Sequence, residues 1–147
     1  MKNEQYSRKN NLKIFGLVHN EGENCAKKMQ KMVKEKLKIN VAEEDVEIAH
    51  RLPASRQENQ EKAVIVKFRN PGVRYAILKA RRALKGTGIS ICEDISASVL
   101  STLKSLRENP NTKDAWCWNG KIFIKDQHDK MHSFGYGTAI PEFFIKQ

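Results

Sequence analysis

The sequence predicts an α+β protein in which a β-α-β-β-α-β segment precedes a smaller α+β segment. Short stretches alternate apolar and polar residues, which is typical of strands with one buried face. Longer stretches between them carry apolar residues at helical spacing. Asn119-Gly120 stands between two apolar runs, as in a two-residue hairpin turn. For 147 residues we expect a basic polar tail (1–11), a first domain (12–93) and a small C-terminal domain (94–147).

The strands of the first domain are expected at residues 12–18, 46–52, 61–68 and 89–92. The third of these is the central one. Alternation places Val64, Val66 and Phe68 on one face and Ala63, Ile65 and Lys67 on the other. The first strand repeats this pattern, with Leu12 and Ile14 on one face and Lys13 and Phe15 on the other. Lys13 and Lys67 should therefore project from the same face of the sheet.

Three helices are expected, over residues 24–37, 70–85 and 96–108. Asn24 is a suitable N-cap, Pro71 suits a first helical position, and Gly86 suits a helix end. The predicted buried stripes are Cys25, Met29, Met32, Val33 and Leu37 in the first helix, Val73, Ala76, Ile77, Ala80 and Leu84 in the second, and Val99, Leu100, Leu103 and Leu106 in the third. Arg74 is expected to lie outside these stripes, on the solvent side.

The predicted element order is that of the split βαβ, ferredoxin-like arrangement, which is also the RNA-recognition-motif (RRM) arrangement. The central strand fits the RRM consensus only at its apolar end, Val66 and Phe68. Ala63 and Ile65 occupy the two aromatic stacking positions. The sequence therefore predicts an RRM-like frame without its usual base-stacking platform.

In the C-terminal domain, the turn fixes the register of a hairpin over residues 115–125. One face is expected to hold Trp116, Trp118, Lys121, Phe123 and Lys125, and the other Ala115, Cys117, Ile122 and Ile124. Aromatic rings beside cations suit stacking on unpaired bases. Alternatively, these rings complete a core with Phe143 and Phe144. A further strand is expected at 130–134, and a short apolar element at 140–145 should dock on the domain.

Composition favours a polyanionic partner. The formal net charge is +10, which points to nucleic acid or an anionic surface. Three widely spaced cysteines favour an intracellular setting, and no apolar run reaches membrane-spanning length. No catalytic motif or zinc-type cysteine spacing is found. We therefore expect no enzymatic activity, no cofactor, no metal and no membrane association.

The candidate phosphate contacts are basic residues at strand ends, on one sheet face, on the second helix and on the hairpin. Phosphate contacts supply affinity that does not depend on sequence. For Arg81, Arg82 and Lys85 the alternative is an ordinary solvated helix face. The full set of nucleic-acid-binding candidates is Arg8, Lys9, Lys13, Arg51, Lys67, Arg69, Arg74, Arg81, Arg82, Lys85, Trp118, Lys121 and Lys125.

Several segments, taken in order, carry a resemblance to a known family. They are residues 6–16 (YSRKNNLKIFG), 48–52 (IAHRL), 63–69 (AVIVKFR), 84–89 (LKGTGI), 92–95 (CEDI) and 118–125 (WNGKIFIK). Together they resemble the RNA-binding half of the first-open-reading-frame protein of LINE-type non-LTR retrotransposons. The C-terminal domain of the baculovirus few-polyhedra protein is similar.

This resemblance implies an atypical RRM and a C-terminal domain that together bind single-stranded nucleic acid. It also implies nucleic-acid chaperone activity, and a homotrimer only if a longer protein carries an upstream coiled coil. By position it favours Arg8, Lys9, Lys13, Arg51, Lys67, Arg69, Arg81, Arg82 and Lys85 as contacts.

The leading hypothesis is a largely sequence-nonspecific module for single-stranded RNA or DNA, in cytoplasmic ribonucleoprotein or the nucleus. The alternative is a protein–protein interaction module that uses the same scaffold.

Overall fold

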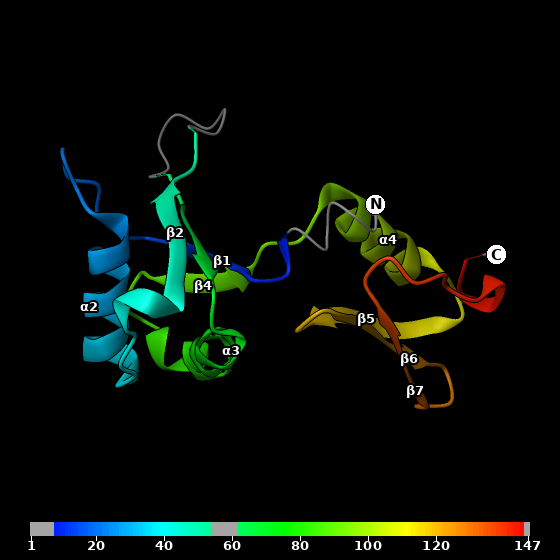
Figure 1. Ribbon diagram of the computed structural model, residues 1–147. Coiled ribbons are helices and arrows are strands. Elements are labelled where there is room, and N and C mark those ends of the chain that lie inside the picture. The colour runs from blue at the N-terminus through cyan, green and yellow to red at the C-terminus, as the bar shows by residue number, and fades with distance from the viewer. Residues whose placement is uncertain (1–7, 54–61, 146–147) are drawn as a thin grey trace. The chain divides into compact units, whose positions relative to one another are not determined.

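The computed structural model describes residues 8–53 and 62–145 (Figure 1). The expectations for residues 1–7 of the tail and for residue 61, the first of the third predicted strand, lie outside these ranges. The described chain is mixed α+β, with two antiparallel sheets and three α-helices. It divides into two compact units. The first is residues 10–94, and the second contains residues 95–145 together with Arg8 and Lys9.

The first unit is built around a four-stranded sheet with the order β2-β3-β1-β4, and every neighbouring pair in it is antiparallel. In chain order its elements are β1 (Asn11–Phe15), α2 (Cys25–Leu37), the 3-10 turn η1 (Glu43–Asp45), β2 (Val46–Arg51), β3 (Val64–Phe68), α3 (Pro71–Ala80), the 3-10 turn η2 (Arg81–Leu84) and β4 (Ser90–Glu93).

One face of this sheet is buried and contacts the helices. Its central strands contribute Leu12, Ile14, Val64, Val66 and Phe68, each at most 1% exposed. Lys13 pairs with Ile65 on one side and Cys92 on the other, so these three residues share the opposite, open face. The alternation predicted for β1 and for residues 64–68 of β3 is confirmed.

Helix α2 follows the sequence prediction closely. The Asn24 side chain accepts a hydrogen bond from the backbone N–H of Lys27 and caps the helix. The buried residues are Cys25, Met29, Met32, Val33 and Leu37, as the helical spacing predicted. The helix ends at Leu37, and the C-cap Lys38 adopts the left-handed conformation with φ of +59°.

The second helix differs from its prediction. It ends at Ala80, and the chain continues as the 3-10 turn η2 rather than as one helix to Lys85. Its buried residues are Arg74, Ile77 and Leu78, whereas Ala76 is exposed. The expectation that Arg74 faces solvent is therefore wrong. Arg74 and Leu78 are one turn apart on the same face, and Glu93 lies beside the guanidinium, which allows this face to include a charged group.

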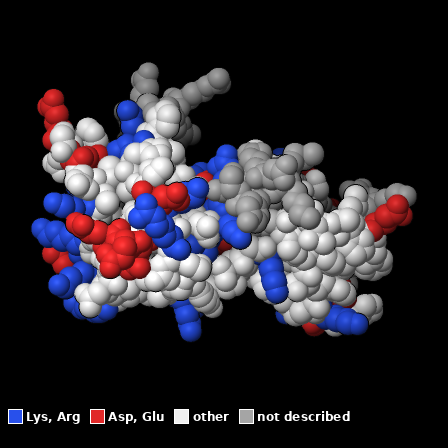
Figure 2. All heavy atoms as spheres, in the orientation of Figure 1, with Lys and Arg blue, Asp and Glu red and all other residues white. Residues whose placement is uncertain are grey.

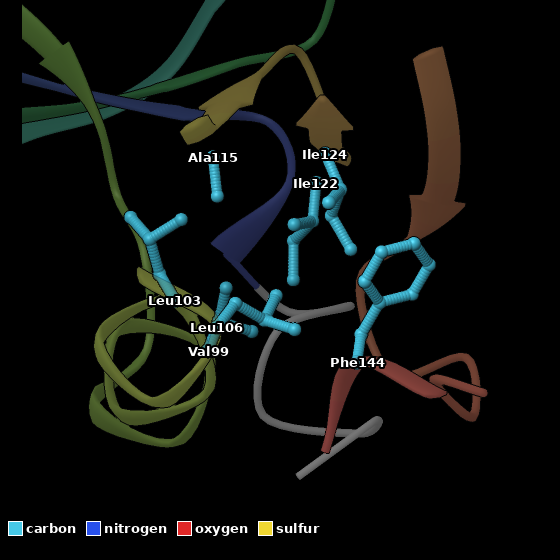
Figure 3. Packing of buried hydrophobic residues seen from close by; sticks show 7 residues of the cluster. All are labelled: Val99, Leu103, Leu106, Ala115, Ile122, Ile124 and Phe144. Atoms are coloured by element: carbon cyan, nitrogen blue, oxygen red, sulfur yellow. The ribbon is translucent and has the colours of Figure 1, made fainter. Parts of the chain in front are cut away.

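The second unit packs one helix on a three-stranded sheet with the order β5-β6-β7. Its elements are α4 (Ala97–Glu108), β5 (Thr112–Trp118), β6 (Lys121–Asp126), β7 (Met131–Gly135) and the 3-10 turn η3 (Glu142–Phe144). The core holds Val99, Leu103, Leu106, Ala115, Ile122, Ile124 and Phe144 (Figure 3). The prediction that Leu100 belongs to this core is wrong, because its side chain is 50% exposed. The docking of the C-terminal apolar element is confirmed through Phe144.

The predicted hairpin register is confirmed pair by pair. Trp118 lies opposite Lys121, Cys117 opposite Ile122, and Trp116 opposite Phe123. Asn119 and Gly120 have φ of +45° and +85°, which is the backbone of a type I′ turn. Since the turn sets which residues share a face, Trp116, Trp118 and Phe123 lie together on the side away from the α4 core.

Candidate nucleic-acid interface

The open face of the first sheet brings Lys13 and Lys67 together with apolar side chains. The register also places Ile65, Ile48 and His50 on this face. Both lysines have nearby carboxylates: Lys13 Nζ lies 3.5 Å from Asp94, and Lys67 Nζ lies 3.5 Å from Glu47. The surface is therefore a mixed one, in which part of the cationic charge is balanced.

Phe15 belongs to this face but is absent from the binding candidates that the sequence suggested. It ends β1, two residues after Lys13, and its side chain is 40% exposed. The signal was present in the sequence, because strand alternation already placed Phe15 on the same face as Lys13. An exposed ring beside a lysine can stack on an unpaired base.

Ala63 is not accessible on the open face. Its side chain is buried, and it precedes β3 rather than belonging to it. Its carbonyl accepts a hydrogen bond of 2.8 Å from the N–H of Leu52. Regular strand geometry begins only at Val64, and Ala63 adds no accessible surface beside Ile65 and Lys67.

Arg51 lies away from the Lys13 face. Its partner in β3 is the buried Val64, so it projects toward the helical layer. There its guanidinium contacts Glu23 at 2.7 Å and donates to the carbonyl of Lys62 at 2.6 Å. The hydrogen bonds from Arg51 and Lys28 hold the pKa of the Glu23 carboxyl well below its usual value of 4.5. Arg51 thus has a structural role, because it links Glu23, which precedes α2, to Lys62, which precedes β3.

Arg74 is likewise held inside the first unit. It is 6% exposed, lies 3.5 Å from the carboxylate of Glu93, and donates through Nε to the carbonyl of Asn11 at 3.4 Å. A guanidinium in this position cannot reach a phosphate while the unit remains folded. The assignment of Arg74 to the interface is therefore corrected to a structural one.

The strongest cationic feature among the predicted residues is a hollow at the end of η2. Arg81, Arg82 and Lys85 line it together with Ile89 and the edge of β4, and its volume is about 480 Å³. Arg82 and Lys85 are exposed, whereas Arg81 is half-buried and donates to the carbonyl of Ile91 at 3.4 Å. Three cations around an open hollow can contact consecutive phosphates of one strand.

The remaining basic candidates are dispersed. Arg69 is exposed just after β3, and its backbone N–H donates to the carbonyl of Asp45. Arg8 is half-buried and Lys9 is exposed, and both are grouped with the second unit. The contacts of the first unit thus bring together Lys13 and Lys67, and separately Arg81, Arg82 and Lys85.

The aromatic face of the hairpin is half-buried. The rings of Trp116 and Phe123 stack with centroids 5.9 Å apart and an angle of 12° between their planes. Lys121 is exposed, and Lys125 lies 3.7 Å from Asp129. Phe144 packs on the opposite face with Ile122 and Ile124. The alternative in which Phe144 completes a core with the tryptophans is therefore wrong, and Phe143 is 59% exposed.

Two further findings concern the part of the chain that the structure describes. None of its helices combines the length and the apolar character needed to cross a membrane. Its His, Cys, Asp and Glu side chains do not gather in threes in a way that could hold a metal ion. In comparisons with known proteins, no protein-family model matches the chain and no curated protein matches it.

Proposed function

We propose that the protein binds single-stranded nucleic acid, RNA or DNA, with little dependence on sequence, and that residues 10–94 form a ferredoxin-like, RRM-type domain. The domain proposal is supported by the β-α-β-β-α-β order and by a four-stranded antiparallel sheet with β1 and β3 at its centre. The motif resemblance to LINE-type retrotransposon proteins supports a retrotransposon origin, and with it chaperone activity in ribonucleoprotein particles.

The observation that carries the binding proposal is the cationic hollow of Arg81, Arg82 and Lys85. It lies beside β4, an edge strand of the sheet whose Cys92 lies on the open face next to Lys13. A strand that crosses the open face toward this edge therefore meets further cations. Phe15 and the hairpin aromatics supply rings for stacking that does not distinguish one base from another.

The test is a pair of double variants with equal change in charge. Arg81→Ala/Arg82→Ala should weaken binding of a labelled single-stranded oligonucleotide about equally across sequences, and should flatten the salt dependence. Fluorescence anisotropy across a salt series measures both. The control is Lys104→Ala/Lys130→Ala, two exposed lysines of the second unit. Equal behaviour of the two variants would show that the η2 cations are only a solvated surface.

A second candidate function is a protein-interaction module. It is favoured by the exposed apolar side chains of Phe15 and Ile48 and by the carboxylates next to Lys13 and Lys67. Such a surface is partly apolar and partly charge-balanced, so it suits a protein partner better than a phosphate backbone. Binding that barely changes as salt rises would favour this alternative.

A further inference from the structure

The outer surface of α2 carries a group of cations that belongs to none of the surfaces described above. Lys31, Lys34 and Lys38 recur at helical spacing and line one open depression together with Glu35 and Asn40. We call these three residues the α2 lysine cluster. In Figure 2, Lys and Arg side chains gather over α2, at the left of the view. All three lysines are exposed, so their ammonium groups can meet a ligand from solvent.

The electrostatic setting of the cluster differs from that of the sheet lysines. Within residues 8–53 and 62–145, no carboxylate forms an ion pair with any of the three, whereas Lys13, Lys28 and Lys67 each have such a partner. Lys27, on the same helix, lines a different hollow that also contains Glu43 and Glu47. Glu35 is the acidic residue that lines the cluster's own depression, which leaves an excess of positive charge there.

Lys38 lies at the C-terminal end of α2. It follows the helix in the left-handed conformation, with φ of +59° and ψ of +34°. Glycine is favoured at such a position because a Cβ strains the backbone. The chain nevertheless places a lysine here, and its Nζ donates to the carbonyl of Glu35 at 2.9 Å. Lys38 therefore caps the C-terminus of α2 and places its side chain at the edge of the depression.

The cluster and the open sheet face lie on opposite sides of the first unit. The buried side of α2, which includes Met29 and Val33, contacts the sheet, and the lysines project from its outer side. An α-helix with its side chains is roughly 10 Å thick, and the sheet lies beyond it. A strand that lies along the Lys13 face therefore does not pass over the cluster.

From this arrangement we infer that the α2 lysine cluster is a second phosphate-binding surface, which holds a nucleic-acid strand separate from the one on the sheet and η2. The inference rests on the proposed function, since it takes the ligand to be the backbone of single-stranded nucleic acid. One molecule then holds two strands on opposite sides of residues 10–94.

The experiment counts bound strands. Native mass spectrometry and calorimetric titration at low salt measure how many single-stranded hexanucleotides bind to the full chain. Lys31→Gln/Lys34→Gln should lower that number by one relative to the wild type. Lys104→Gln/Lys130→Gln, with the same change in charge on the second unit, should leave it unchanged. Circular dichroism verifies that both variants are folded, which is expected because all four lysines are exposed.

A third variant separates binding from stability. Lys38→Gly removes one charge of the cluster and also relieves the left-handed strain. It should raise the melting temperature of the first unit while it weakens the second hexanucleotide's binding severalfold. Loss of binding cannot then be attributed to unfolding.

The outcomes distinguish this inference from the proposed function. A wild type that binds no hexanucleotide at low salt overturns both. If the wild type binds hexanucleotide but Lys31→Gln/Lys34→Gln binds as many strands as the control variant, the second surface alone is overturned.

Discussion

The basic side chains of this chain fall into two groups that a count of charges cannot distinguish. Arg51 and Arg74 are held against Glu23 and Glu93 inside the first unit, whereas Arg82 and Lys85 are exposed around a hollow. Each of these two pairs is neutral and contributes nothing to the formal net charge of +10, so the charge that a polyanion can meet comes from other cations, such as those around the hollow.

Replacing Arg74 tests its structural role. Arg74→Ala leaves the carboxylate of Glu93 buried without its partner, which should destabilise the first unit by roughly 3–5 kcal/mol. The paired change Arg74→Met/Glu93→Leu should recover much of that loss, because it removes both charges. Urea denaturation measures the difference. Wild-type stability in Arg74→Ala would contradict the buried ion pair.

The lowered pKa of Glu23 predicts a pH dependence. A carboxyl whose pKa falls on folding stabilises the native state above its unfolded pKa, and this contribution is lost as the pH drops. The stability that Glu23 gains from Arg51 and Lys28 should therefore shrink as the pH falls below the usual value of 4.5, because the carboxyl is then protonated in the unfolded state. Glu23→Gln should be less stable than the wild type at about pH 6, and the gap should narrow toward about pH 3. A gap that stays constant across this range would contradict the prediction.

At the scale of elements, the sequence predicted what local patterns determine. Asn119-Gly120 fixed the hairpin register, and Asn24 with the 3.6-residue spacing located α2 and its buried face. The sequence predictions were wrong where contacts with residues distant in the chain determine whether a side chain is buried. Arg74 of α3 is buried because it lies 3.5 Å from the carboxylate of Glu93, a residue of β4. Leu100 is exposed although its spacing on α4 allows burial, because the core is filled by Val99, Leu103 and Phe144.

The hairpin's aromatic face predicts a separation of binding from stability. Trp118 lies opposite Lys121 and outside the α4 core, so Trp118→Ala should weaken oligonucleotide binding by roughly 1–3 kcal/mol, as for one base stacked on a ring. Its cost in stability should be well below that of Ile124→Ala, a fully buried position where roughly 2–5 kcal/mol is expected. Tryptophan quenching and thermal melting measure the two effects. Equal destabilisation by both changes would show that the ring belongs to the core.

In the whole molecule, hydrophobic periodicity predicted the order of strands and helices. It predicted the positions of the candidate binding residues only in part. Strand alternation is a local property, and it correctly assigned Lys13, Lys67 and Phe15 to one face of the sheet. The hollow of Arg81, Arg82 and Lys85 could not be foreseen in the same way. It depends on the change from α-helix to 3-10 turn after Ala80, which brings these side chains beside β4.

The central claim is that phosphate contacts dominate binding, and salt dependence tests it most directly. Labelled single-stranded and duplex oligonucleotides are titrated by fluorescence anisotropy at several salt concentrations. Three phosphate contacts, as the η2 hollow offers, give a logarithmic slope of roughly −2, so affinity for the single strand should fall about twentyfold from roughly 50 to 200 mM salt. An affinity that stays constant over this range, or no binding at low salt, would contradict the account.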